Sequence, residues 1–140
     1  MNILIVGSGG REHAFGWHLK RSPLTDKLFF APGNAGTAAI GENLSISAND
    51  FDAIRNAVLK NDIKLVIVGP EEPLVRGIVD YFKSEQSLSG IKIIGPDSKA
   101  AALEGSKDFA KQFMQRHGLP TAASWHFTAE EPALACVRQQ

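Results

Sequence analysis

The stretch ILIVGSGGREHA, residues 3–14, decides the fold. Four apolar residues lead directly into a glycine-rich turn, and the residues after the turn suit a helix. A strand that enters a helix through such a turn is typical of a βαβ unit, in which the first helical amides face a bound anion. The anion could be the phosphate of a nucleotide cofactor or of a phosphorylated metabolite, and the remaining sequence has to distinguish the two.

Short apolar runs alternate with segments of helical periodicity along the first two thirds of the chain. Phe51, Ile54 and Val58 recur at helical spacing after a capping residue, Asp50 or Asn49, and residues 74–82 form a second such segment. The predicted strands are residues 2–6, 27–31, 64–68 and 91–95, with 44–47 as a weaker fifth. This alternation predicts an α/β fold, a Rossmann-like open parallel sheet with helices on both faces.

The pattern changes after Gly95. Residues 98–118 predict a helix that is interrupted near Gly105 and Ser106 and stopped by Gly118. Residues 123–127 are a possible strand, and TAEE at 128–131 has the form of a capping box that opens a helix running to the end of the chain. We therefore predict an N-terminal domain over residues 1–104, and over 105–140 a linker helix with the start of a second domain.

Composition excludes several classes of protein. Lys plus Arg and Asp plus Glu both number 15, so no net charge favours nucleic acid or an anionic membrane. The apolar runs are too short to span a bilayer. Cys136 is the single cysteine, and neither a CxxC nor a His pair at ligand spacing occurs, so no disulfide or zinc site is predicted. A soluble, cytoplasmic protein is expected.

Each strong predicted strand runs into a Gly or Pro motif at its carboxyl end. Ligands of open parallel sheets bind outside these ends, near the point where the strand order reverses. Four specialised loops at one edge favour a binding rim over simple turns. The loops are residues 7–13, 32–37, 69–74 and 95–99.

The first loop argues against a dinucleotide. The GxGxxG fingerprint requires a third glycine five residues after Gly7, and that position is Glu12. The second predicted strand ends in FFAPGN, without the carboxylate that would hold the ribose of NAD. The GxxxxGK[ST] motif is also absent. What remains is a set of amides at Gly9, Gly10 and Arg11, with the Arg11 guanidinium, which suits a small phosphate monoester.

Four separated motifs resemble one family. GSGGREHA, APGNAGT, VIVGPEEPL and LEGSKDFAKQFMQRHGLPTA together are similar to the N-terminal part of the phosphoribosylamine–glycine ligases, also called glycinamide ribonucleotide synthetases. The resemblance extends in order over nearly the whole chain. It implies the N-terminal domain of an ATP-grasp enzyme and the truncated start of its ATP-binding part. The family joins glycine to 5-phosphoribosylamine with ATP and Mg²⁺, through a glycyl phosphate, in purine biosynthesis.

The resemblance also implies which residues bind the substrate. Gly9, Gly10 and Arg11 would face the phosphate of phosphoribosylamine. Asn34, Thr37 and Glu71 are hypothesised to contact the ribose hydroxyls or the amine, whereas Glu72 is expected to face solvent. The complete predicted set is Gly9, Gly10, Arg11, Glu12, Asn34, Gly36, Thr37, Gly69, Pro70 and Glu71.

For the nucleotide, the resemblance implies that Lys107 reaches ATP, whereas Lys111 is expected to be solvated. No catalytic residue and no metal ligand is predicted within this chain. By the same resemblance, the Mg²⁺ ligands and the glycine site lie past Gln140, so this chain alone is expected to be inactive.

Two other functions stay open on the residues alone. One is a dinucleotide-binding domain of an oxidoreductase, and the other is a noncatalytic regulatory or docking module. Structural explanations also compete at single positions. Phe15 and Trp17 are expected in the core or an interdomain contact, Ser106 as a helix cap, and Gly16 as a point of close packing on the sheet.

Overall fold

The computed structural model describes residues 1–139. The chain forms two compact units, Met1–Gly105 and a second unit that begins at Ser106, and each is described by itself. The assignment of residues 1–104 and 105–140 to separate domains of a larger enzyme stays a prediction.

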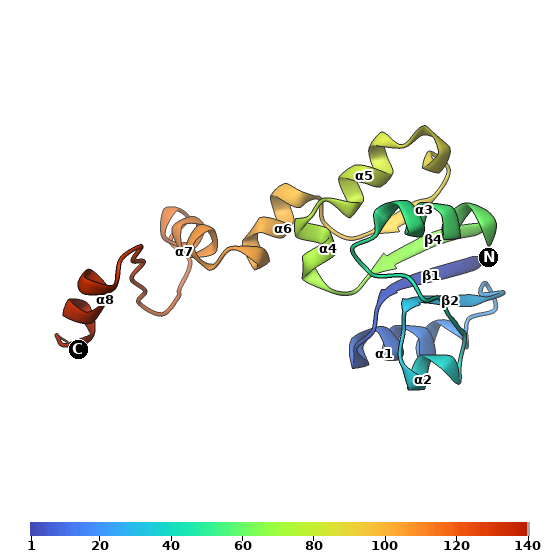
Figure 1. Cartoon of the computed structure of the whole chain (residues 1–140), viewed down its shortest axis with the longest axis horizontal. Coiled ribbons are helices and arrows are strands. Elements are labelled where there is room, and N and C mark those ends of the chain that lie inside the picture. Colours follow the sequence, from blue (N-terminus) through green and yellow to red (C-terminus); the bar gives the residue numbers. More distant parts are fainter. Residues whose placement is uncertain (140) are drawn as a thin grey trace. The chain divides into compact units, whose positions relative to one another are not determined.

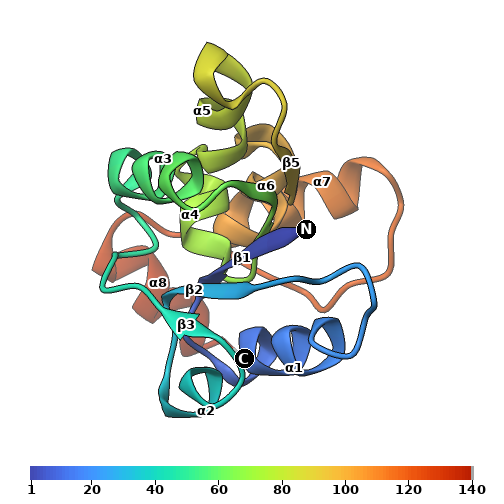
Figure 2. The same cartoon turned by 90° about the vertical axis from the view of Figure 1, so that its right-hand side faces the viewer.

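A parallel sheet forms the centre of the first unit (Figure 1). Its strands lie in the order β3-β2-β1-β4-β5, and every neighbouring pair is parallel. Figure 2 shows β3, β2 and β1 in succession. The fold predicted from the alternating pattern is confirmed. The strands are β1 (Asn2–Gly7), β2 (Leu28–Pro32), β3 (Glu42–Asn43), β4 (Ile63–Val68) and β5 (Lys92–Ile94).

Helices cover both faces of this sheet. In Figure 1, α1 and α2 lie on one side of the strands and α3, α4 and α5 on the other. Asp50 caps α3, because its Oδ1 accepts a hydrogen bond from the Ala53 amide at 3.0 Å. The helices of this unit are α1 (Gly10–Leu19), α2 (Ala35–Ala38), α3 (Phe51–Lys60), α4 (Glu71–Val75), α5 (Ile78–Ser84) and α6 (Ser98–Gly105), with a 3₁₀ turn, η1, at Gln86–Leu88.

The strand residues divide between two apolar clusters because successive side chains point to opposite faces of a sheet. On the α1 face, Ile3, Ile5 and Phe30 pack with partly buried residues that include Ile40. A Cβ built on Gly16 would lie 2.5 Å from Phe30 Cζ, so the helix approaches the sheet this closely only because residue 16 is glycine. The predicted close packing of Gly16 is confirmed.

The second cluster is larger and lies on the opposite face. Leu4 and Val6 of β1 contribute to it together with Ile54 of α3 and Ile78 of α5. All four are completely buried. Because β1 is buried on both faces of the sheet, its sequence is a continuous apolar run and does not alternate between apolar and polar residues.

Two predictions for this unit are wrong in detail. The fifth strand is Glu42–Asn43, and residues 44–47 instead follow it as a loop whose Leu44 and Ile46 pack against the core. The helix predicted over 74–82 is divided at Gly77, whose φ of 88° ends one helix and begins another. Phe15 and Trp17 are 41% and 48% exposed, so neither is a core residue of this unit, and the interdomain contact expected as the alternative stays a prediction.

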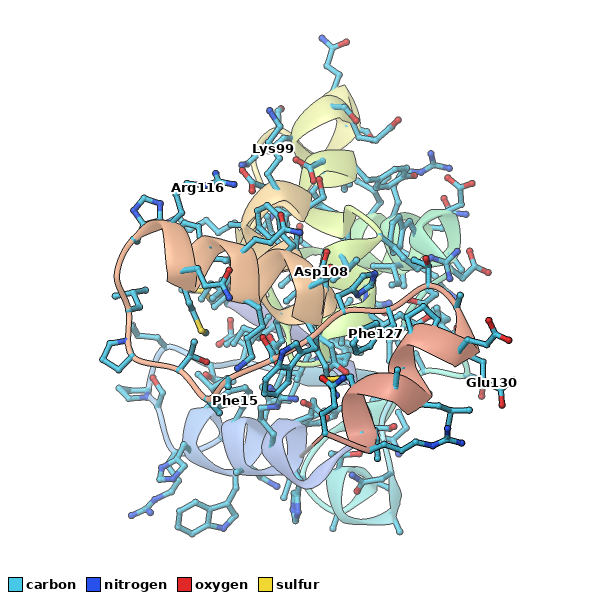
Figure 3. All side chains as sticks on the ribbon, turned by 90° about the vertical axis from the view of Figure 1, so that its left-hand side faces the viewer. Phe15, Lys99, Asp108, Arg116, Phe127 and Glu130 are labelled. Atoms are coloured by element: carbon cyan, nitrogen blue, oxygen red, sulfur yellow. The ribbon has the colours of Figure 1, made fainter. Side chains whose placement is uncertain are left out.

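The second unit contains α7 (Lys107–Arg116) and α8 (Glu130–Val137). Ser106 caps α7 as predicted, through a 3.3 Å bond from the Phe109 amide to its Oγ. Gly118, with φ of 63°, follows the end of the helix. Asp108 lies near the start of α7 and Arg116 near its end (Figure 3), an arrangement that complements the helix dipole.

Three predictions fail in this unit. Residues 123–127 form no strand, because among the described residues no neighbouring strand supplies the ladder that would hold one. The helix after TAEE does form, but its N-cap is Ala129, which offers no side-chain oxygen, so the predicted capping box is absent. The helix ends at Val137 instead of continuing.

A polar network joins α3 to α5 at the edge of the larger cluster. The Tyr81 hydroxyl donates to Asp52 Oδ1 at 2.6 Å and accepts from Arg55 Nη1 at 3.0 Å. Partial burial raises the pKa of Tyr81, and the hydrogen bond to Asp52 raises this pKa further, while Arg55 opposes the shift. The network therefore favours the neutral phenol.

A titration of tyrosinate absorbance tests this network cleanly, because Tyr81 is the only tyrosine in the chain. We expect a midpoint above the ordinary value of about 10 and a lower midpoint in Asp52→Asn. Since the folded-state pKa is raised, the stability that the phenol contributes is complete below about pH 10 and is lost as the pH rises through the folded-state pKa. Tyr81→Phe contains no tyrosine and serves as the blank for the absorbance titration. A wild-type midpoint at or below the ordinary value would contradict the network.

Candidate functional site

The strand order reverses between β1 and β4. From β1 the chain proceeds outward through β2 to β3, then returns to place β4 on the other side of β1. The loops that follow β1 and β4 meet at this point, where the Gly69 amide donates to the Val6 carbonyl at 3.0 Å. A crevice at such a reversal is where ligands of open α/β sheets bind.

A cavity of about 590 Å³ lies at this reversal. Its walls come from the loop after β1 with the first turn of α1, from the end of β2, from the loop before α3, and from the start of α4. This volume is within the usual range of small-molecule sites. The lining residues are Gly7, Ser8, Gly9, Arg11, Glu12, Pro32, Ser47, Ala48, Asn49, Pro70, Glu72 and Pro73.

Glu12 is the one carboxylate that this cavity buries. The residue is 3% exposed. Its Oε2 accepts a hydrogen bond from the Gly9 amide at 2.5 Å. Gly9 is the N-cap of α1 and Glu12 is its third helical residue, so this is the bond that a capping box makes to the N-cap amide. Its Oε1 accepts no hydrogen bond from the described residues and lies 3.5 Å from Arg11 Nε.

The glycines of two loops leave room for this carboxylate. A Cβ built on Gly69 would overlap the Glu12 carboxyl group, and a Cβ on Gly7 would lie 2.8 Å from Glu12 Cδ. Glu12 thus packs between the ends of β1 and β4, at the position where the dinucleotide fingerprint has a third glycine for close packing of the helix on the strand. Its position in the sequence therefore marks a different kind of site.

The Glu12 carboxylate also occupies one of the backbone amides that were predicted to bind the phosphate. Gly9, Gly10 and Arg11 were all expected to offer free amides, but the Gly9 amide is already bonded to Glu12. An internal anion therefore already occupies part of the N-terminus of α1, so the prediction of a free Gly9 amide is wrong. Gly10 begins α1 but does not line the cavity, whereas Arg11 does, with its side chain 56% exposed.

Asn34 and Thr37 are bonded inside the protein. Asn34 Oδ1 accepts from the Gly36 and Thr37 amides and so caps α2, while its Nδ2 donates to the Ser8 carbonyl at 2.8 Å. Thr37 is completely buried, and its hydroxyl lies 2.7 Å from Asn43 Oδ1. These bonds fix the loop after β2 against the loop after β1. Direct ligand contacts by Asn34 and Thr37 stay predictions that this geometry does not support.

The acidic pair after β4 divides between solvent and cavity. The Glu72 side chain is 66% exposed, as expected for a residue that faces solvent, and it also lines the open side of the cavity. Glu71 does not line the cavity, and its contact with the ligand stays a prediction. Glu72 Oε1 accepts from Asn49 Nδ2 at 2.8 Å and lies 3.8 Å from Arg76 Nη1. Pro70, one of the predicted substrate-binding residues, lines the cavity, while Gly36 and Gly69 do not.

Asn49 belongs to a loop that the sequence did not identify as part of the site, and Ser47 and Ala48 of this loop also line the cavity. The Asn49 Nδ2 donates a hydrogen bond to Glu72 Oε1. The Asn49 Oδ1 is buried and accepts no hydrogen bond from the described residues. The sequence showed Asn49 only as a possible helix cap. Its proximity to Glu72 depends on how α4 packs beside the loop before α3, which local pattern does not reveal.

The second unit has a cavity of its own, about 420 Å³, between α7 and the loop at Ser124–His126. Lys107, the residue predicted to reach ATP, lines it together with Trp125. Lys111 was expected to be solvated, but its Nζ donates to Thr121 Oγ1 at 2.6 Å and to the Ala122 carbonyl at 2.8 Å.

Within residues 1–139, no three His, Cys, Asp or Glu side chains gather as a metal site requires. No helix in the same part of the chain combines the length and apolar character needed to cross a membrane.

The sheet order and the helices on both faces define a doubly wound α/β domain with a cavity at the strand reversal. Residues 1–104 match the family model for the phosphoribosylglycinamide synthetase N domain, and the chain belongs to this family.

Curated relatives agree over the whole chain. Phosphoribosylamine–glycine ligases of Haemophilus influenzae and Escherichia coli K12 are 53% and 48% identical to it, each over 100% of this chain. The chain spans about one third of the length of these relatives, 32% in both cases.

Solved structures give the same fold. A phosphoribosylamine–glycine ligase from Thermotoga maritima is 32% identical, with a TM-score of 0.57 over 88% of this chain and 26% of its own. A biotin carboxylase domain of a bacterial carboxylase is 17% identical, with a TM-score of 0.64 over 99% of this chain and 34% of its own. The second likeness concerns the fold alone. None of these relatives is an oxidoreductase, so the dinucleotide alternative gains no support.

Proposed function

We propose that this chain is the N-terminal part of an ATP-dependent carbon–nitrogen ligase and that its cavity holds 5-phosphoribosylamine while glycine is joined to it. One observation carries the proposal. The segment that matches the family model contains a cavity of about 590 Å³ at the strand reversal, and Glu12 stands there where the dinucleotide fingerprint requires a glycine.

The proposed work of this domain is positioning. Holding an amine against an activated carboxyl group converts a bimolecular encounter into an oriented one, which lowers a barrier by up to about 7–11 kcal/mol in favourable cases. The half-exposed Arg11 guanidinium is the cation that lines the cavity, so it is the proposed partner of the phosphate. The parent enzyme would act in the cytoplasm, in purine biosynthesis.

ATP and Mg²⁺ belong to the proposal for the longer enzyme. Within this chain, Lys107 is the proposed contact to the nucleotide, as a compact cation beside phosphate oxygens. Its place at the first position of α7, in the wall of a cavity, is compatible with that role. The glycine site and the Mg²⁺ ligands are proposed to lie in the part of the relatives that this chain does not span.

Titration of the 140-residue chain with ribose 5-phosphate, followed by NMR, tests the substrate site. We expect saturable shifts in the loops at residues 7–12 and 47–49. Arg11→Ala should weaken binding about three- to tenfold, because one charge-assisted hydrogen bond is lost at a half-exposed position.

Arg21→Ala is the matched control, since Arg21 lies just past the other end of α1, over the Trp17 ring. NADH should give no saturable shifts in either loop. Tight NADH binding there would favour the dinucleotide alternative, and the absence of any ribose 5-phosphate binding would favour a docking module.

A further inference from the structure

A polar cluster of three side chains, Asn34, Thr37 and Asn43, lies behind one wall of the cavity. Asn34 Nδ2 donates to the Ser8 carbonyl at 2.8 Å and to the Gly9 carbonyl at 3.3 Å. Ser8 and Gly9 line the cavity, whereas none of the three residues of the polar cluster does. Asn34 therefore acts on this wall from outside the cavity.

The peptide group between Ser8 and Gly9 is held on both of its sides. The Ser8 carbonyl and the Gly9 amide belong to this one peptide group, in which C=O and N–H point in opposite directions. Asn34 bonds the carbonyl, and Glu12 Oε2 bonds the amide. With both sides bonded, the peptide group keeps one orientation, and the backbone that a ligand would meet at Gly9 keeps one shape.

Asn43, at the end of the edge strand β3, holds Asn34 in turn. Its Nδ2 donates to the main-chain carbonyl of Asn34 at 2.8 Å, and its Oδ1 lies 2.7 Å from the Thr37 hydroxyl. The Thr37 hydroxyl is also 2.9 Å from that carbonyl. The carbonyl already accepts from the Ala38 amide as well, so both of its lone pairs are used. The single proton of the Thr37 hydroxyl is therefore donated to Asn43.

The polar cluster is tightly built around a buried hydroxyl. Thr37 is completely buried, and its Oγ1 accepts from the Asn34 amide at 2.7 Å. A Cβ built on Gly33 would overlap Asn43 Oδ1 and lie 2.7 Å from Thr37 Oγ1. Asn34 is thus bonded at its main-chain amide, its main-chain carbonyl and its side chain, and it has one position from which to hold the loop after β1.

We propose that Asn43 and Thr37 are positioning residues for the ligand. They do not touch it, but they hold Asn34, and through Asn34 the Ser8–Gly9 peptide, in the orientation that binds the sugar phosphate. This inference rests on the proposed function of the same cavity. It gives Asn34 and Thr37 an indirect role in place of the direct contacts first hypothesised, and it adds Asn43, which the sequence did not single out.

Hydrogen exchange of the Gly9 amide, followed by NMR, tests the positioning without any ligand. Asn43→Ala should speed this exchange about three- to tenfold, because the loss of its hydrogen bonds lets the Ser8–Gly9 peptide leave its orientation by local opening. The amide of Val6, in the buried part of β1, exchanges through wider unfolding. Comparison of the two amides separates a local effect from a general loss of stability.

Thr37→Val and Thr37→Ser form a matched pair. Valine has the shape of threonine without the hydroxyl, so Thr37→Val should speed the exchange of Gly9 as Asn43→Ala does. Serine keeps the hydroxyl, so Thr37→Ser should keep the slow exchange even though the lost methyl group lowers the stability. A role of Thr37 in packing alone would make Thr37→Ser the more damaging of the two.

The same variants test the effect on the ligand. Asn43→Ala and Thr37→Val should weaken ribose 5-phosphate about three- to tenfold, since the binding orientation is then populated only part of the time. In an Asn34→Ala background, Asn43→Ala should weaken binding no further, because Asn43 acts through the Asn34 side chain.

Asn2→Ala is the matched control. Asn2 Nδ2 donates to the Asn61 carbonyl at 2.8 Å, a bond of the same kind and length as the bond from Asn43, but it lies at the amino end of β1. Its loss should change neither the exchange of Gly9 relative to Val6 nor the affinity for ribose 5-phosphate.

The outcomes separate this inference from the proposed function. If the wild-type chain binds ribose 5-phosphate, and Asn43→Ala and Thr37→Val keep either its affinity or the slow exchange of Gly9, the positioning role is wrong and the substrate site stands. If the wild-type chain binds no ribose 5-phosphate, the proposed function fails, and the role of the polar cluster in binding fails with it.

Discussion

Gly69→Ala should destabilise the chain by about 1–3 kcal/mol, the usual cost of overpacking a well-packed region. Gly69 is buried, and the three atoms nearest to a Cβ at this position all belong to the Glu12 side chain. The added methyl group would displace the Glu12 carboxylate and break its bond from the Gly9 amide. Because Glu12 lines the cavity, binding of ribose 5-phosphate should weaken at least about tenfold.

A double-mutant cycle assigns this effect to one contact. Glu12→Ala removes the atoms that the added methyl group would overlap, so Gly69→Ala should cost almost nothing in that background, and the coupling free energy should be about 1–3 kcal/mol. Urea unfolding measures it. Gly90→Ala is the matched control, since a Cβ there meets no atom within 4 Å. Equal costs of Gly69→Ala with and without Glu12 would show that Glu12 does not occupy this space.

Gly16→Ala should also destabilise the chain, although Gly16 lies inside α1. Helix propensity alone favours alanine over glycine by about 1 kcal/mol. The new methyl group would lie 2.5 Å from Phe30 Cζ and 3.0 Å from Ile40 Cδ1. Phe30 is completely buried and has no space to retreat, so overpacking at about 1–3 kcal/mol outweighs the propensity gain.

Gly10→Ala in the same helix provides the comparison, since a Cβ at Gly10 meets no atom within 4 Å. It should leave the urea midpoint unchanged or raise it slightly. Phe30→Leu, which shortens the side chain facing residue 16, should reduce the cost of Gly16→Ala. A Gly16→Ala variant as stable as Gly10→Ala would contradict the close packing of α1 on the sheet.

The architecture was predictable because it depends on local pattern. Ile3 to Val6 are continuously apolar, as strands covered on both faces require, and their parallel pairing follows from the helices between strands. The same dependence on local pattern explains the two strands predicted at residues 44–47 and 123–127, which the structure does not contain. Each has strand-like composition, but a strand forms only where a neighbour completes its hydrogen bonds, and the neighbour is not visible in local sequence.

The candidate site was predictable in its location but not in its inner arrangement. The sequence placed Arg11, Glu12 and Pro70 at one edge of the sheet, and all three line the cavity. It did not reveal that Glu12 turns inward and bonds the Gly9 amide, or that Asn49 bonds Glu72. The second pair is distant in sequence and is brought together by packing, and the inward position of Glu12 depends on Gly69, which lies far from it in the sequence.

A crystal structure of the chain soaked with ribose 5-phosphate and NADH together tests the central claim most directly. The account predicts a single sugar phosphate in the cavity at the reversal between β1 and β4, with its phosphate towards Arg11. A dinucleotide lying across Glu12, with no sugar phosphate in the cavity, would contradict it.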